Sequence, residues 1–349
     1  MLNPHFPSWL TASRGFFATW IVLRHLSANS MGPASWILDY LPRLKTFDIP
    51  TTYFFMLSGL IFTLGKTHAS GFASIRHFWF ARIGRLYPLY LLAVVFSAPI
   101  GWKFSGGDWD VFLRNGLAEM TLTQGWLFEQ GHSWLTVGWF MSSVAFCYFF
   151  YPVLAPPIQR RSVGFLAFLI LGLGALTLAL GIHVDEKART DAIAETVRRT
   201  PAFPLLLFVQ GIAAGELLNR GRRVALLPIG LALLIGGAWV IMHETPNGHH
   251  YLVGGALWLL PLVLLSYVPV SAPASLVSYG ELGFTLYMLH WPIYIYSRGL
   301  LKAAGLAPWL TSPVYLVLIL SVIILLSRWV YNNFERPIQD RIRKLARAS

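Results

Sequence analysis

The stretch TASRGFFATWIVLRHLSA (residues 11–28) lies in an apolar run near the N-terminus, yet it contains two arginines and a histidine. An α-helix needs about 20 largely apolar residues to cross the hydrocarbon core of a bilayer, and this run is long enough. A charged side chain inside the bilayer costs about 2.5–3.5 kcal/mol on insertion scales, so such residues normally face a bundle interior or a water-filled cavity. Arg14 and His25 are therefore candidate functional residues.

The spacing of these residues predicts that they share one face of the helix. Arg14 and His25 are eleven residues apart, which at about 100° per residue is three turns plus roughly 20°, and about 16 Å along the axis. Arg24 points about a quarter turn away. Histidine exchanges its proton near neutral pH, so His25 could act as a general base or as an acyl-carrying nucleophile. The alternative is a structural histidine bonded between helices, with Arg14 at the headgroup level.

The composition of the 349-residue chain indicates a membrane protein. Hydrophobic residues make up 56% and charged residues only 12%, whereas soluble domains average about 25% charged residues. The mean hydropathy is +0.58. The net charge of +12 could suggest nucleic-acid binding, but the cations cluster between apolar runs and at the C-terminus. The tendency of cytoplasmic loops to be basic explains that pattern better, so no nucleic-acid partner is expected.

The apolar runs predict an all-α, polytopic transmembrane bundle of about ten helices. The predicted spans are 9–28, 47–65, 79–99, 133–156, 163–182, 202–218, 225–242, 250–268, 280–297 and 312–332. With a cytoplasmic N-terminus, the basic segments after the second, fourth, sixth and tenth spans all face the cytoplasm. Both termini are then cytoplasmic, and residues 1–349 form one membrane domain with no separate soluble domain. No removable signal peptide is recognisable.

One apolar segment, residues 110–130, is predicted not to cross the membrane. Arg114 and Glu119 interrupt it, and a crossing there would move the later basic segments to the outer side, against the charge rule. We expect an outer amphipathic or re-entrant segment.

Two arginines enter the third span from the cytoplasmic side. Arg82 and Arg85 in FWFARIGRLYPLYLL (residues 78–92) are three apart and share a helix face. Guanidinium groups bind phosphate well, so the pair would suit a nucleotide-bearing substrate. The alternative is anchoring at the headgroup level with the side chains extended toward water.

Three further polar positions lie within or beside spans. Ser58, followed by Gly59, could bond across helices or serve only close helix packing. His290 is in the middle of the ninth span, and Pro292 leaves a carbonyl one turn upstream unpaired; it could share a polar cavity with His25 or form an interhelical hydrogen bond. Glu335 lies just after the tenth span, where the chain reaches the cytoplasm and where it could pair with Arg82 or Arg85 or form an interface salt bridge. No metal site is expected from the spacing of histidines, cysteines and carboxylates.

Taken in order, these motifs resemble the acyltransferase-3 family of integral membrane O-acyltransferases. The resemblance runs from Arg14 and His25 through FFMLSGLIF, RIGRLYPLY, WFMSSVAFCYFFYP and LGFTLYMLHWP to FERP at the end of the last span. Two positions depart from the family pattern. Thr52 stands where an acidic residue is frequent, and Val144 stands where many members have glutamate.

The resemblance implies transfer of an acetyl or other acyl group from acyl-CoA to a hydroxyl. The expected acceptors are cell-surface or exported polysaccharides, lipid-linked glycans or similar carbohydrates, and the expected location is a bacterial cytoplasmic membrane. The expected catalytic residues are His25 and Arg14. The candidate cofactor-binding residues are Arg82, Arg85, His290, Ser58 and Glu335.

Two other classes stay open at this stage. A transporter or flippase of a polar lipid or glycan would also have about ten spans and buried charges, although transporters often have two related halves and no such symmetry is visible. A catalytically silent scaffold is the third reading, favoured by Val144 and opposed by the presence of both Arg14 and His25.

Overall fold

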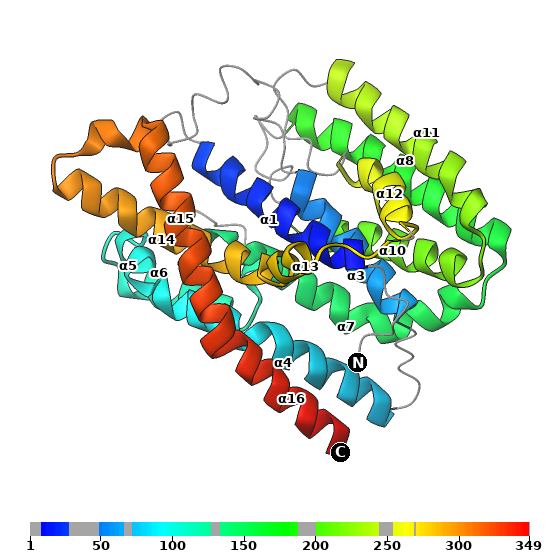
Figure 1. The fold of residues 1–349 in the computed structure, drawn as a ribbon, viewed down its shortest axis with the longest axis horizontal. Helices are drawn as coiled ribbons and strands as arrows, with labels where there is room; N and C mark the ends of the chain where they lie inside the picture. The colour runs from blue at the N-terminus through cyan, green and yellow to red at the C-terminus, as the bar shows by residue number, and fades with distance from the viewer. Residues whose placement is uncertain are drawn as a thin grey trace. The chain divides into compact units, whose positions relative to one another are not determined.

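The computed structural model describes residues 8–27, 49–65, 72–126, 133–187, 200–243, 254–268 and 270–348, and within these ranges it contains helices and no strands (Figure 1). The all-α prediction is therefore confirmed for this part of the chain. Most residues between the predicted spans 163–182 and 202–218, and between 225–242 and 250–268, lie outside these ranges. The helices group into two compact units that are interleaved in the sequence.

The first unit contains α1 (Ser8–Ser27) as far as Phe17 and the continuation of α7 from Phe146. Its other helices are α3 (Ile49–Leu64), α8 (Val163–Lys187), α10 (Ala202–Asn219), α11 (Arg223–His243), α12 (Gly254–Leu265) and α13 (Ala274–Glu281).

Glycines allow α3 and α10 to pack with their backbones in contact. A Cβ added to Gly59 would lie 2.1 Å from the Phe208 carbonyl oxygen, and one added to Gly211 would lie 2.1 Å from the Met56 carbonyl oxygen. Small residues permit this approach between membrane helices, where packing rather than the hydrophobic effect drives association. The prediction that Gly59 serves close helix approach is confirmed.

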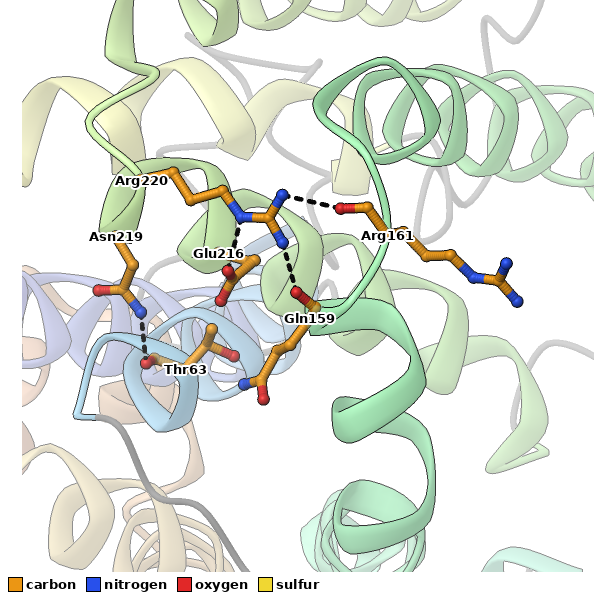
Figure 2. A network of polar contacts seen from close by, with 6 residues as sticks. All are labelled: Thr63, Gln159, Arg161, Glu216, Asn219 and Arg220. Atoms are coloured by element: carbon orange, nitrogen blue, oxygen red, sulfur yellow. Dashed lines mark hydrogen bonds and ion pairs between the residues drawn. The ribbon is translucent and has the colours of Figure 1, made fainter.

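Arg220 joins the C-terminal ends of α10 and α7, as Figure 2 shows. Its Nε donates to Glu216 Oε1 at 2.7 Å, and its Nη1 donates to the Arg161 carbonyl at 2.8 Å. Its Nη2 donates to the carbonyl of Gln159. Helix C-termini leave carbonyl groups unpaired and carry partial negative charge, so a guanidinium group stabilises them on both counts.

The C-terminal end of α3 contacts the C-terminal end of α10 beside Arg220. The side-chain amide of Asn219 donates to the Thr63 carbonyl at 2.9 Å, next to Arg220 (Figure 2). The ends of the second, fourth and sixth predicted spans therefore lie together within this unit. This agrees with the prediction that the basic segments following them share one side of the membrane.

The second unit contains the remainder of α1 from Ala18 and α4 (Phe72–Phe96) from Arg76. Its other elements are α5 (Ala98–Phe104), α6 (Trp109–Met120), the short turns η2 (Gln124–Trp126) and η3 (Thr136–Gly138), the start of α7 (Trp139–Gln159), α14 (Gly283–Ala303), η4 (Ala307–Thr311), α15 (Pro313–Val330), the π-helical η5 (Tyr331–Glu335) and α16 (Arg336–Ala348).

The segment predicted not to cross the membrane begins with α6. This helix has 12 residues, about 18 Å at 1.5 Å per residue, which is shorter than the hydrocarbon thickness of about 30 Å. The Asp108 carboxylate caps its N-terminus by accepting from the Asp110 and Val111 amides. α6 therefore supports the prediction for its part of the segment.

The buried carboxylate of Glu119, near the end of α6, binds the segment that leads into α7. Glu119 is 1% exposed and accepts hydrogen bonds from the Ser133 hydroxyl and from the Leu135 amide at 3.0 Å. Tyr90 of α4 donates to the Glu119 carbonyl at 2.9 Å, and Gln124 donates to the Tyr90 hydroxyl at 2.8 Å. Burial raises the pKa of the Glu119 carboxyl, with the two donors opposing the shift.

Six helical stretches among the described residues are long and apolar enough to cross a membrane. They are Ile75–Phe96, Thr136–Gln159, Val163–Leu180, Ala202–Asn219, Arg223–Val240 and Pro313–Ile342. These coincide with six of the ten predicted spans. The predicted spans 47–65 and 250–268 correspond to shorter apolar helices, Pro50–Leu64 and Gly255–Leu265. The spans predicted at 9–28 and 280–297 overlap the helices α1 and α14, which are more polar and carry the two candidate histidines, and the count of ten spans stays a prediction.

Candidate active site

The second unit brings together the two histidines that the sequence singled out. His25, near the end of α1, places its Nδ1 2.7 Å from Nε2 of His290 in the middle of α14. His290 is completely buried, whereas His25 is partly exposed. Both of the alternatives predicted for His290, an interhelical hydrogen bond and a polar site shared with His25, are thus compatible with this contact.

The two imidazole rings meet edge to edge. Their planes are parallel within 2°, and their centroids are 5.0 Å apart. That separation equals the N···N distance of 2.7 Å plus the centroid-to-nitrogen radius of each ring. The line between the two nitrogens therefore passes through both centroids, and the N–H bond, which lies in its ring plane, points directly at the other nitrogen. The geometry is that of a linear hydrogen bond.

The second nitrogen of His290 is bound to its own helix. Nδ1 lies 2.7 Å from the Tyr287 carbonyl oxygen and 3.2 Å from the Leu286 carbonyl oxygen. α14 continues through Pro292 to Ala303, so the proline does not interrupt the helix beside His290. Both ring nitrogens of this buried histidine are thus engaged.

Aromatic side chains surround the histidine pair. The Trp291 ring lies edge-on to His25 with 5.8 Å between centroids, and the Tyr287 ring is 5.8 Å from His290. The Tyr287 hydroxyl donates to the Val137 carbonyl at 3.0 Å, which ties α14 to the turn before α7. The buried indole N–H of Trp291 has no hydrogen-bond acceptor among the described residues. This buried donor therefore has no acceptor in the described part of the chain, although its ring lies against His25.

The N-terminal end of α14 contacts the candidate carboxylate Glu335. Glu335 is buried and accepts hydrogen bonds from the Thr285 hydroxyl and, at 2.7 Å, from the side-chain amide of Gln339. It belongs to the π-helical η5, which joins α15 to α16. Single π-helical turns frequently occur at functional sites. Thr285 and His290 are five residues apart on α14, so this helix links Glu335 to the histidine pair.

The candidate arginines lie on α4, which packs against α16. A Cβ added to Gly84 would lie 2.6 Å from Cδ1 of Ile342, so the two helices are in close contact at this point, side by side in Figure 1. Arg82 is half-buried with its guanidinium 5.3 Å from the centre of the Phe78 ring, and Arg85 is exposed. Gly84 lies between them in the sequence.

α16 adds further cations to this contact. Its sequence, RPIQDRIRKLARA, is strongly basic, and Arg336, Arg341 and Lys344 are exposed. Both α4 and α16 are therefore rich in positively charged residues.

Arg14 and Ser58 belong to the first unit. Arg14 is half-buried, and its charge acts on the hydroxyl of Tyr53, which also bonds to Ser13 at 2.5 Å. The Ser58 hydroxyl donates to the Phe54 carbonyl at 2.7 Å within its own helix. The Ser58 oxygen also lies 3.4 Å from the Tyr148 hydroxyl of α7, so the described contacts are compatible with both predictions for Ser58, a bond across helices and close packing beside Gly59.

The model of an acyltransferase domain family matches residues 8–328. The chain belongs to the acyltransferase-3 family. The match extends from α1 through nearly all of α15, so it includes both histidines and both candidate arginines, and it ends before Glu335. With its apolar helices, the protein is an integral membrane acyltransferase.

A curated relative of this acyltransferase is acyltransferase MdmB of Streptomyces mycarofaciens. The two are 24% identical over 322 residues, which cover 84% of this chain and 80% of the relative. No solved structure matches the chain.

The two departures from the family pattern are both buried in this acyltransferase. Thr52 accepts a hydrogen bond from the Trp258 indole N–H at 2.9 Å, in the first unit. A neutral hydroxyl therefore serves as the acceptor where an acidic residue is frequent. Val144, at the start of α7, is 3% exposed and contributes an apolar side chain.

Sequence reasoning missed the groups that hold the candidate residues in place. Thr285 donates to Glu335, and the carbonyl groups of Leu286 and Tyr287 bind His290. A threonine in an apolar helix carries no distinctive signal, and backbone carbonyls carry none.

Proposed function

We propose that this acyltransferase moves an acetyl or other acyl group from acyl-CoA to a hydroxyl of a cell-surface or exported polysaccharide, a lipid-linked glycan or a similar carbohydrate. The observation that carries the proposal is the hydrogen-bonded pair of His25 and His290 inside a membrane acyltransferase. An imidazole that is partly exposed and oriented by a second group is suited to activate a hydroxyl.

The proposed reaction needs one group that accepts and returns a proton. His25 takes the proton of the acceptor hydroxyl while its oxygen forms a bond to the acyl carbon, and the C–S bond of the thioester breaks. The CoA thiolate then takes the proton from His25, so the enzyme returns to its starting state. An alternative with the same residues forms an acyl-His25 intermediate first.

The proposed donor site is the cationic α4–α16 pair. Arg82 and Arg85 would bind the phosphates of CoA, with exposed cations of α16 increasing the local positive potential. Arg14 stays a proposed catalytic residue. Glu335 is proposed to position this region through Thr285 and Gln339. Acyl-CoA is cytoplasmic, so the proposal places these arginines at the inner side of a bacterial cytoplasmic membrane.

Kinetics with acetyl-CoA test the donor site. Hydrogen bonds to charged groups contribute about 1.5–3 kcal/mol, so Arg82→Ala should raise the KM for acetyl-CoA by about 10–100-fold. Arg76→Ala is the matched control, because Arg76 is an exposed arginine earlier on the same helix. An unchanged KM in Arg82→Ala and Arg85→Ala would contradict phosphate binding by this pair.

A further inference from the structure

A chain of hydrogen bonds leads from the backbone of α14 through His290 to His25. Among the described residues, the contacts of His290 Nδ1 are with carbonyl oxygens, at 2.7 and 3.2 Å. Carbonyl oxygens accept hydrogen bonds and never donate, so this nitrogen must carry the hydrogen. In neutral His290 the other nitrogen, Nε2, then carries the lone pair and acts as an acceptor.

The tautomer of His290 determines the tautomer of His25. The partner of the His290 Nε2 lone pair is Nδ1 of His25, 2.7 Å away on a line through both rings. Nδ1 of His25 must therefore carry the hydrogen that fills this bond. In neutral His25 the lone pair is then on Nε2, which points away from His290 because the two nitrogens lie on separate edges of the ring.

We propose that His290 is a positioning residue that holds His25 in the tautomer with its lone pair on Nε2, so that Nε2 is the nitrogen that reacts. This inference rests on the proposed function and specifies it. It applies to both versions of the reaction, since Nε2 either takes the proton of the acceptor hydroxyl or attacks the thioester carbon. It also assigns to His290 a role other than contact with the acyl donor.

The histidine pair takes up one proton and releases it again within each reaction cycle. When Nε2 of His25 takes a proton, the imidazolium keeps its Nδ1–H bond to the His290 lone pair, and that bond becomes charge-assisted and stronger. When the CoA thiolate takes the proton from Nε2, both rings return to the neutral state. The burial of His290 and the engagement of both its nitrogens leave it no direct contact with the donor.

Three substitutions at position 290 separate this role from packing. The amide oxygen of His290→Gln reaches the level of Nε2 and can accept from His25. The amide of His290→Asn reaches only the level of Nδ1, so it can bind the carbonyls of α14 but not His25. His290→Phe keeps a ring of similar size and offers no acceptor. Met288→Leu, a buried substitution on the same helix, is the control.

The assay measures transfer of labelled acetyl from acetyl-CoA to glycan extracted from membranes of the expressing host, with the purified protein in nanodiscs. General acid–base assistance typically contributes about 10²–10⁴-fold, so we expect His290→Asn and His290→Phe to lower kcat at least about 10²-fold, with an unchanged KM for acetyl-CoA. We expect His290→Gln to stay within about tenfold of wild type. Thermal stability of each variant, measured in parallel, identifies those that fold.

The activities of the His25 and His290 variants distinguish a failure of the proposed function from a failure of the positioning role. If His25→Ala is fully active, the proposed function of His25 is wrong. If His25→Ala is inactive while folded His290→Asn retains wild-type kcat, the positioning role alone is overturned. A raised KM for acetyl-CoA with an unchanged kcat in the position-290 variants would also overturn it, because it would mean that His290 contacts the donor.

Discussion

Replacing Gly59 by alanine should destabilise the first unit, because its Cβ would enter the backbone of α10. The added carbon would lie 2.1 Å from the Phe208 carbonyl oxygen and 3.0 Å from the Ile212 amide nitrogen. Both atoms are backbone, so no side-chain rotation relieves the clash. A Cβ contact essentially never falls below 3.0 Å, so α3 and α10 must separate by about 0.9 Å at this point.

The size of the effect follows from over-packing in protein interiors. Inserting one carbon into a closely packed interior costs about 1–3 kcal/mol. A loss of 1 kcal/mol lowers Tm by about 2–4 °C in chains of 150–250 residues, so a drop of about 5 °C is expected here. The matched control is Gly172→Ala on α8, where an added Cβ has no neighbour within 4 Å.

The assay is thermal unfolding of both variants in the same detergent, followed by tryptophan fluorescence. Gly172→Ala should retain the wild-type Tm or exceed it slightly, because alanine favours helix over glycine. Equal Tm values for Gly59→Ala and Gly172→Ala would refute the close contact between α3 and α10.

Two further predictions concern buried carboxyl groups. The raised pKa of Glu119 means that its contribution to stability is present below the ordinary value of 4.5 and is lost as pH rises through the folded value. The Tm of wild type minus that of Glu119→Gln should therefore fall as pH rises above 4.5. A difference that rises with pH would contradict burial of this carboxyl. Thr285→Val removes a hydrogen-bond donor from buried Glu335 and should lower the free energy of unfolding by about 1–3 kcal/mol. Thr285→Ser keeps a hydroxyl and should lower it much less. Equal Tm values for these two variants would show that the bond contributes nothing to stability.

Much of the helical arrangement could be predicted from hydropathy. The apolar runs at 79–99, 133–156 and 163–182 coincide with helices of membrane-spanning length. Arg114 and Glu119 predicted an amphipathic or re-entrant segment at 110–130, and α6, which ends at Met120, is shorter than a membrane-spanning helix. In each case the signal is local, because it depends on the residues of one segment and their transfer energies.

The contacts of the candidate site could be predicted only in part. His25 and His290 were each recognisable as polar groups in apolar helices, but their hydrogen bond joins residues 265 positions apart and depends on how α1 and α14 pack. The pairing of Glu335 with Arg82 or Arg85 stays a prediction, whereas the hydrogen bonds that the structure gives Glu335 come from Thr285 and Gln339. The π-helical turn that contains Glu335 has no signature in residue propensities.

The role of His25 in acyl transfer is the central claim, and the most direct measurement is the rate of acetyl incorporation from acetyl-CoA by His25→Ala. The control is His77→Ala, which removes an exposed histidine on α4. The account predicts that folded His25→Ala loses at least about 10²-fold in kcat and that His77→Ala matches wild type. Wild-type incorporation by a correctly inserted His25→Ala protein would contradict the account.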